Sequence, residues 1–282
     1  MQLNLDTRQR AILAEMGVRV WSPRHLPAQA PTTAPPAPLD TRPSSMPGVA
    51  NPAAPEAVPV ADPLASPLAA PIAASMLPEG LAKMDWQSLS QAAHACQACG
   101  LCKGRNHSLF ASGSATPGQR AGWLIVGDAP TDAENLAGQA FVGDEGVLLD
   151  AMLQSLGLSR HAHHSGAEQT MVTNAVKCHP PDNRNPSAQE IALCHAYLQR
   201  QIELLQPRVI LALGRFAAQA LLTPSQGVGA AQPLGKLRGQ VHQAHGRPVV
   251  VSYHPSYLLR TPSDKAKAWA DLCLAMQQGR QA

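Results

Sequence analysis

Four short apolar runs constrain the fold of this chain more than any other feature. Each run is rich in β-branched or other apolar residues and is bounded by turn residues: GWLIVGDAP (122–130), TMVTNAV (170–176), PRVILALG (207–214) and RPVVVSYHP (247–255). Such runs are typical of parallel strands buried on both faces. Helical patterns lie between and after them: 146–157, 187–206, 214–222 and 263–278.

This alternation of strands and helices predicts an α/β fold. Helical crossovers between parallel strands cover both faces of the sheet. We therefore expect residues 79–282 to form a three-layer α/β/α sandwich with a central, mainly parallel four-stranded sheet. Ligands of such sheets bind at the carboxyl ends of the strands. Asp128, Asn174 and His254 each follow a predicted strand, so the sequence predicts a site at that edge.

The first 78 residues differ in composition from the rest. Residues 26–78 hold 14 prolines and 14 alanines among 53 residues. Because repeated proline removes backbone donors and interrupts helices and sheets, we expect a disordered Pro/Ala-rich linker without chemistry of its own. Residues 1–25 contain a short apolar pattern, and we expect a small element there that contacts a protein partner.

Charge and hydropathy limit the partners and the cellular compartment that suit this chain. The formal net charge is +3, and from Cys96 onward 16 Lys and Arg stand against 12 Asp and Glu, which permits a polyanionic partner without requiring one. No apolar run approaches the roughly 20 residues that cross a bilayer, and the N-terminus lacks the apolar core of a secretory signal. We therefore expect a cytoplasmic protein with reduced thiols and no membrane contact. We also expect it to be a monomer.

The cysteines are grouped like metal ligands. Cys96, Cys99 and Cys102 follow the pattern C-x2-C-x2-C, and Cys178 and Cys194 lie downstream in the same predicted domain. In a reducing compartment, clustered cysteines more often bind metal or do redox chemistry than form disulfides. Four thiolates suit zinc or an iron–sulfur cluster. Spacing alone distinguishes neither the two metals nor the four ligands among five candidates.

From about residue 90 to 276, the motifs resemble those of the family 4 uracil-DNA glycosylases, which carry an iron–sulfur cluster. The matching stretches are, in order, C-x2-C-x-L-x3-R (96–105), VGDAP, FVG (141–143), TNAVKCHPPDNRNP, the helix cysteine, LGRFAAQALL, LRG and YHPSYLLR. The resemblance implies a [4Fe-4S] cluster with a structural role, bound by Cys96, Cys99, Cys178 and Cys194. Cys102 falls on a position that the family does not require.

The resemblance also implies an activity, the hydrolysis of the N-glycosidic bond of uracil in single- or double-stranded DNA at the start of base excision repair. A stacked base is out of reach, so the enzyme must first extrude it. By resemblance, Phe141 stacks on the base, Asn174 pairs with its N3–H and O4, and His254 hydrogen-bonds O2 as negative charge develops. Asp128 orients water or offsets positive charge on the sugar.

Four more positions complete the expected site. Ala129 follows Asp128 in the base-binding motif, while Glu134 and Asn183 match positions that support the substrate network. Leu258 lies in the loop after the histidine, and we weigh two roles for it equally. It wedges into the base stack as the nucleotide leaves, or it packs in the core.

Two residues depart from the family pattern. The family usually has Glu at the position of Asp128 and Gly at that of Thr131. Near the uracil C5 edge, a threonine either tightens the rejection of thymine or crowds the pocket. One alternative is therefore a non-catalytic iron–sulfur protein of the same superfamily that binds uracil-DNA or another partner. A redox or zinc protein unrelated to DNA is the other, but it leaves TNAVKCHPPDNRNP and YHPSYLLR unexplained.

Overall fold

The computed structural model describes residue 15 and residues 77–115, 120–161, 168–226 and 232–281. The predicted N-terminal element (1–25) and linker (26–78) therefore lie almost entirely outside the described residues. None of the described helices combines the length and apolar character needed to cross a membrane.

The centre of the sheet is parallel, as predicted. The four predicted strands are β2 (Trp123–Gly127), β4 (Glu168–Asn174), β5 (Val209–Leu213) and β7 (Arg247–Ser252). They pair in the order β4-β2-β5-β7, each parallel to its neighbour. Every residue of β2 and β5 is buried, which is why these strands appear in the sequence as continuous apolar runs.

Three shorter strands extend this centre to seven in the described residues. β1 (Ser112–Gly113) and β3 (Leu158–Ser159) pair with β4, and β6 (Val241–Ala244) pairs antiparallel with β7. The prediction of four strands thus missed the edges. Two-residue strands carry no periodicity, and β6 is mostly exposed. The β6–β7 hairpin turns at His245 and Gly246, whose φ angles of 50° and 71° suit a tight hairpin turn.

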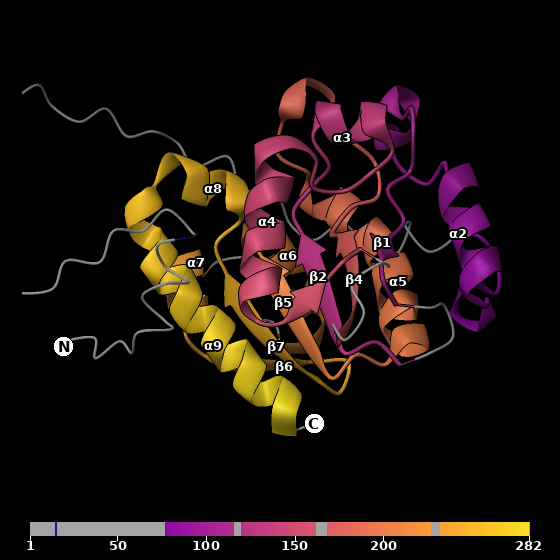
Figure 1. The fold of residues 1–282 in the computed structure, drawn as a ribbon. Coiled ribbons are helices and arrows are strands. Elements are labelled where there is room, and N and C mark those ends of the chain that lie inside the picture. Colours follow the sequence, from indigo (N-terminus) through magenta and orange to yellow (C-terminus); the bar gives the residue numbers. More distant parts are fainter. Residues whose placement is uncertain (1–14, 16–76, 116–119, 162–167, 227–231, 282) are drawn as a thin grey trace, which may run out of the picture. The chain divides into compact units, whose positions relative to one another are not determined.

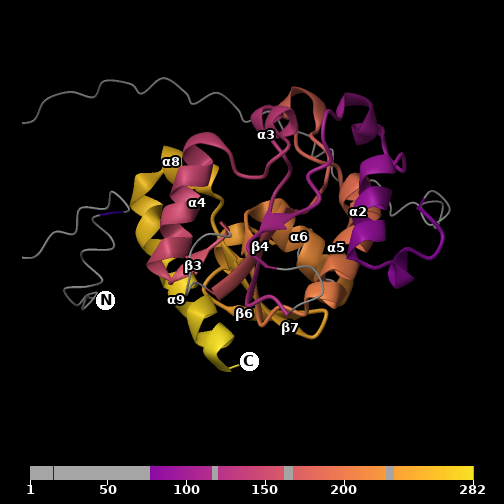
Figure 2. The same ribbon diagram turned by 45° about the vertical axis from the view of Figure 1, so that its right-hand side comes forward.

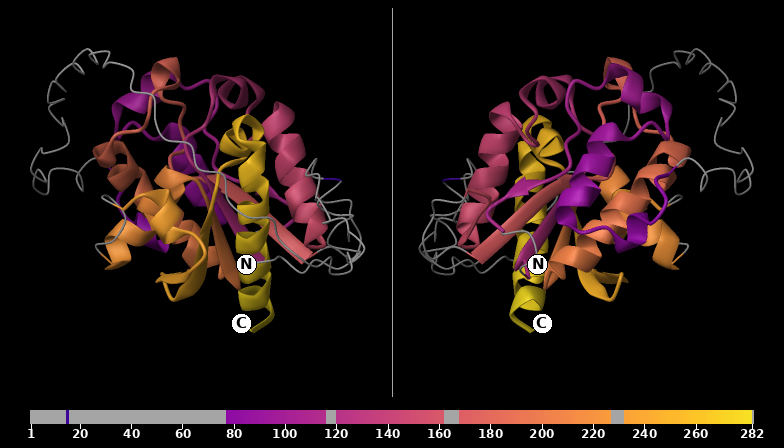
Figure 3. Two further views of the ribbon diagram at one scale, coloured as in Figure 1. Left: turned by 90° about the vertical axis from the view of Figure 1, so that its left-hand side faces the viewer. Right: turned by 90° about the vertical axis from the view of Figure 1, so that its right-hand side faces the viewer.

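Helices cover both faces of the sheet, which confirms the three-layer prediction (Figures 1 and 2). α4 (Gly143–Ser155) and α9 (Lys265–Gln281) pack on one face, while α5 (Ala188–Leu205) and α6 (Arg215–Gln226) pack on the other. Figure 3 shows these layers from two opposite sides. Side chains alternate accordingly in β2, where Leu124 packs with α5 and α6, and Ile125 packs with α4 and α9.

Shorter helices lie around these layers. α2 (Trp86–Ala95) packs outside α5 through Leu89 and Tyr197. The others are α3 (Asp132–Ala137), α7 (Leu234–Leu237), α8 (Pro255–Arg260) and the 3₁₀ helices η2 (Leu81–Lys83), η3 (Gly100–Gly104), η4 (Pro181–Asn183) and η5 (Pro262–Asp264). α3 and α8 follow the carboxyl ends of β2 and β7, so both begin at the edge where a site is expected.

Candidate active site

Three of the predicted site residues meet at the carboxyl edge of the sheet. The ring of Phe141 stacks on the imidazole of His254, with 5.3 Å between centroids and 26° between planes. A Cβ atom added to Gly127 would lie 2.6 Å from Phe141 Cζ and 2.9 Å from Asn174 Oδ1. The Phe141 ring and the Asn174 amide therefore both lie against the backbone at the end of β2, where a side chain would displace them.

The amide of Asn174 is buried and incompletely bonded. The residue is 2% exposed, and its Oδ1 atom has no hydrogen-bond partner in the structure. The backbone that carries it is fixed, because Asn174 pairs with Gly127 in the sheet and Ala175 N–H donates to Gly127 O at 2.8 Å. A buried acceptor without a partner costs free energy, so it marks a place where a ligand with a donor group fits.

His254 is held as a neutral donor. It caps the N-terminus of α8, where the Ser256 backbone N–H donates to His254 Nδ1 at 3.3 Å. Since Nδ1 accepts, the ring proton is on Nε2. Burial, with a smaller contribution from the Arg260 guanidinium, lowers the pKa of His254 to about 4. The ring is thus uncharged near pH 7, and Glu145 Oε2, 3.9 Å from Nδ1, faces a neutral imidazole.

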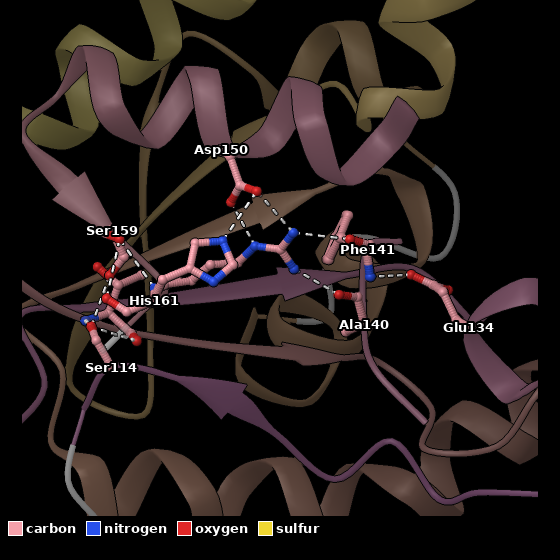
Figure 4. A network of polar contacts seen from close by, with 9 residues as sticks. Ser114, Glu134, Ala140, Phe141, Asp150, Ser159 and His161 are labelled. Atoms are coloured by element: carbon pink, nitrogen blue, oxygen red, sulfur yellow. Dashed lines mark hydrogen bonds and ion pairs between the residues drawn. The ribbon is translucent and has the colours of Figure 1, made fainter. Parts of the chain in front are cut away.

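Phe141 occupies a strained backbone conformation that its neighbours hold in place. Its φ angle is 54°, in the left-handed region that non-glycine residues rarely adopt. The Phe141 N–H donates to Glu134 Oε1, while the Arg160 guanidinium donates to Ala140 O at 2.7 Å and to Phe141 O at 3.0 Å. Figure 4 shows Phe141 between Glu134 and the group around Asp150. The network fixes the direction of the Phe141 ring.

Arg160 is in turn held by a carboxylate. Its Nε and Nη2 atoms donate to Asp150 Oδ1 at 2.6 Å and to Oδ2 at 3.1 Å, and Arg160 is 8% exposed. Asp150 also contacts His161 Nε2 at 3.2 Å, but His161 is exposed and makes no contact with the Phe141 backbone in the described structure. Arg160 and His161 both contact Asp150, but only Arg160 also holds the Phe141 backbone, so substitutions at these two positions form a matched comparison.

For the activity that the sequence resemblance implies, replacing Arg160 with methionine is expected to lower kcat/KM for uracil-containing DNA by about 10- to 100-fold, because the Phe141 ring loses its support. His161→Ala, which removes the other partner of Asp150, should change it by less than about twofold. The measurement is steady-state cleavage of a uracil oligonucleotide by both variants. Adding Arg160→Met to Phe141→Ala should cost little more. Equal losses of kcat/KM in Arg160→Met and His161→Ala would contradict the role of Arg160 in supporting Phe141.

Asp128 lies at the same edge, but its carboxylate is directed at α6. Oδ1 accepts from the backbone N–H groups of Phe216 at 2.8 Å and Ala217 at 2.9 Å, in the first turn of that helix. Gly214, with φ of 107°, leaves room for the carboxylate; a Cβ there would lie 2.3 Å from Oδ2. Burial raises the pKa of Asp128 to about 6, against the lowering effect of these two donors.

Thr131 has a structural task that was not predicted, although the T-x-x-E pattern of residues 131–134 is typical of a capping box. It is the N-cap of α3, where its hydroxyl accepts from Glu134 N–H at 3.3 Å and its own N–H donates to Glu134 Oε2 at 2.7 Å. This capping box orients the same glutamate that binds Phe141 N–H. Because φ of Thr131 is −84°, the position does not require glycine.

The remaining predicted residues lie around this centre. Ala129 is partly buried and packs on the core beside α5 and α6. Asn183 is exposed, and its Oδ1 accepts from Asp132 N–H at 3.4 Å at the start of α3. Leu258 is 0% exposed and packs in the core with α4 and α9, whereas the adjacent Leu259 is 40% exposed. Of the two roles weighed for Leu258, core packing is the one that this conformation displays.

The clustered cysteines share one pocket, and none of the three side chains above lines it. Cys96, Cys99, Cys102, Cys178 and Cys194 all line it. Polar hydrogens point at the sulfur atoms. Arg105 Nη1 donates to Cys178 Sγ at 3.5 Å, and Lys177 N–H donates to Cys194 Sγ at 3.3 Å.

This donor set fits a metal centre that takes thiolates. Burial raises the pKa of Cys194 to about 12, so the thiolate needs a compensating positive charge. Among the residues that the structure describes, no three His, Cys, Asp or Glu side chains converge as they would around one metal ion. Thiols spaced around a pocket suit the separate irons of a cluster, each of which binds one sulfur. The geometry places five thiols in the pocket and does not choose four.

Comparison with known proteins connects this geometry to a family. Residues 115–273 match the model of the uracil DNA glycosylase superfamily. A type-4 uracil-DNA glycosylase of Pyrobaculum aerophilum is 36% identical over 196 residues, which cover 68% of this chain and 93% of that protein. This chain is a type-4 member of the uracil-DNA glycosylase superfamily.

Other type-4 uracil-DNA glycosylases agree. That of Archaeoglobus fulgidus is 36% identical over 171 residues, covering 59% of this chain and 79% of that protein. That of Thermotoga maritima is 33% identical over 180 residues, covering 64% and 85%. The superfamily match contains Asp128, Phe141, Asn174 and His254, so the site described above lies inside the shared region.

Two residues of this glycosylase site were not found from the sequence. Arg160 follows a two-residue strand, and no local pattern predicts that it bonds a loop 20 positions earlier. Lys177 was visible as the one charged residue in the run TNAVKC, which is a signal for a buried cation with a specific partner.

Proposed function

We propose that this protein hydrolyses the N-glycosidic bond of uracil in DNA and so starts base excision repair. Membership of the type-4 glycosylases supports the activity. The observation that carries the assignment of the site is Asn174 Oδ1, a buried acceptor without a partner, next to an aromatic ring. Uracil supplies the missing donor at N3–H, and the Asn174 amide N–H can donate to O4. Phe141 offers its ring to the extruded base.

The bond cleavage places opposite charges on its two fragments. The electrons of the C1′–N1 bond go to uracil, whose negative charge spreads to O2, and His254 Nε2–H donates to that oxygen. A neutral imidazole in a fixed position stabilises this charge without having to transfer a proton first. The sugar carries positive charge at C1′, which the Asp128 carboxylate offsets. Water then adds to C1′ and passes its proton to Asp128.

We further propose a [4Fe-4S] cluster on Cys96, Cys99, Cys178 and Cys194. The shared pocket, the sulfur-directed N–H groups and the type-4 relatives support it. When bound, the cluster supplies a positive centre that keeps these thiolates ionised and ties η3 to the segment after β4 and to α5. Cys102 lines the same pocket and is left as a neighbour because the family pattern does not require it.

The function is tested with an oligonucleotide that carries a single uracil. Wild-type protein should produce alkali-labile abasic sites in the single strand and opposite guanine, and a matched thymine oligonucleotide should stay intact. Asn174→Ala should lower the rate by about 100-fold, since two hydrogen bonds to the base are lost. Tight binding of the uracil strand without cleavage by folded, iron-loaded wild-type protein would instead support the non-catalytic alternative.

The remaining expectations stand as proposals beside this one. We assign the activity to residues 79–282, the linker role to 26–78 and a contact with a protein partner to 1–25. We also propose that the enzyme acts as a monomer in the cytoplasm.

A further inference from the structure

Lys177 lies between the thiol pocket and Asn174, and the mechanism above gives it no role. The residue is 2% exposed, and its Nζ atom donates to the Asn174 carbonyl at 2.8 Å. Its backbone N–H donates to Cys194 Sγ at 3.3 Å, and the residue is among those that line the pocket of the cysteines. One buried residue therefore contacts both centres.

The position of Lys177 is fixed from several directions. Nζ also donates to Thr173 Oγ1 at 2.6 Å, and that hydroxyl donates to Phe110 O at 2.7 Å. The Lys177 carbonyl accepts from Leu109 N–H at 2.8 Å. The lysine thus closes the turn after β4 and joins it to the segment that precedes β1. Movement of the ammonium group would move the Asn174 backbone.

The positive charge of Lys177 requires a compensating negative charge, which the thiol pocket can supply. Both acceptors of its amino group are neutral, a carbonyl and a hydroxyl. Its own backbone N–H donates to Cys194 Sγ, and Cys178 is the next residue in the chain. A buried ammonium without a compensating charge is strongly destabilising. Thiolates bound to a metal centre carry that charge.

We propose that Lys177 is a positioning residue that couples the thiol pocket to uracil recognition by Asn174. Lys177 contacts the thiol pocket through its backbone N–H, which donates to Cys194 Sγ, and holds the Asn174 carbonyl through its ammonium group. The state of the metal centre then affects how firmly Asn174 binds uracil, and bound uracil affects the metal centre in return. This inference rests on the proposed function and gives the cluster a role beyond tying the fold together.

The test compares two lysine-to-methionine variants of the full-length, iron-loaded protein. Lys177→Met keeps the length of the side chain and removes its donors, while Lys103→Met makes the same change at an exposed lysine in η3, next to Cys102. The readouts are the inhibition constant of free uracil and the iron content. We expect Lys177→Met to raise the inhibition constant by about tenfold at wild-type iron content. Lys103→Met should leave both values unchanged.

Two further measurements separate coupling from a general loss of structure. Lys177→Met should add no further loss of uracil affinity to Asn174→Ala, because it acts through that residue. Saturating uracil should change the visible absorbance of the wild-type iron centre and not that of Lys177→Met. Additive losses, or wild-type uracil affinity in iron-loaded Lys177→Met, would overturn the proposal.

A second variant covers the case in which Lys177→Met does not fold. Thr173→Val removes one acceptor of the ammonium group and leaves the lysine in place, so it should weaken uracil inhibition severalfold with iron retained. Undiminished uracil affinity in that variant would count against the coupling. The proposed function fails separately, if wild-type protein releases no uracil from DNA.

Discussion

His254→Ala is expected to slow uracil release by about 10²- to 10³-fold in single-turnover reactions, the cost of losing one positioned donor to developing negative charge. The structure supplies the physical reason, because Ser256 N–H fixes Nδ1 as an acceptor and leaves Nε2–H free to donate. The rate is measured with saturating enzyme, so that DNA binding does not limit it. A rate within a few-fold of wild type would remove His254 from the mechanism.

Ser256→Ala is the matched control for this histidine. It deletes the hydroxyl that lies 2.8 Å from Nδ1 but keeps the backbone N–H that sets the tautomer. We expect a loss of less than about fivefold. Because the pKa of His254 is lowered to about 4, the wild-type rate should show no change from histidine titration between pH 6 and 7.

The second large effect is expected at Asp128, whose carboxyl group should make the reaction rate depend on pH. The pKa of its carboxyl is raised to about 6 by burial, so the wild-type rate should fall as the pH drops below about 6 and the carboxylate is protonated. Asp128→Asn should lose about 10²- to 10³-fold at pH 8 and should lack this acid limb. Single-turnover rates from pH 5 to 9 check both. An unchanged acid limb in the variant would assign it to another group.

Stability provides an independent measure of the same carboxylate. A folded-state pKa above the unfolded value of 3.8 means that the folded protein binds the proton more tightly, so this group removes stability as the pH rises from about 4 to 6. The cost above pH 6 is roughly 2–3 kcal/mol. Asp128→Asn should therefore unfold at a higher temperature than wild type at pH 8, while its activity is lower. A variant that is less stable at pH 8 would show that the cap on α6 outweighs the burial of charge.

Much of the site followed from the sequence because its residues stand at strand ends. Asn174 and His254 follow runs whose burial is visible in their composition, and parallel strands bring their carboxyl ends to one edge. Phe141 was found only through the family pattern, since nothing local distinguishes a stacking ring from a packed one. The structure then placed these three together and directed the carboxylate of Asp128 at α6.

By itself the sequence determined the parallel centre of the sheet, its two helical layers and the grouping of the cysteines, because each leaves a periodic or spaced pattern along the chain. Only the tertiary structure decided what Arg160 and Lys177 do. Arg160 donates to the Ala140 carbonyl 20 residues earlier, and the Lys177 N–H donates to the Cys194 sulfur 17 residues later, so neither contact leaves a local trace in the sequence. Thr131 differs, because its partner Glu134 lies three residues later in a local capping pattern. The burial of Leu258 was again decided by the tertiary structure, by which face of α8 meets the core.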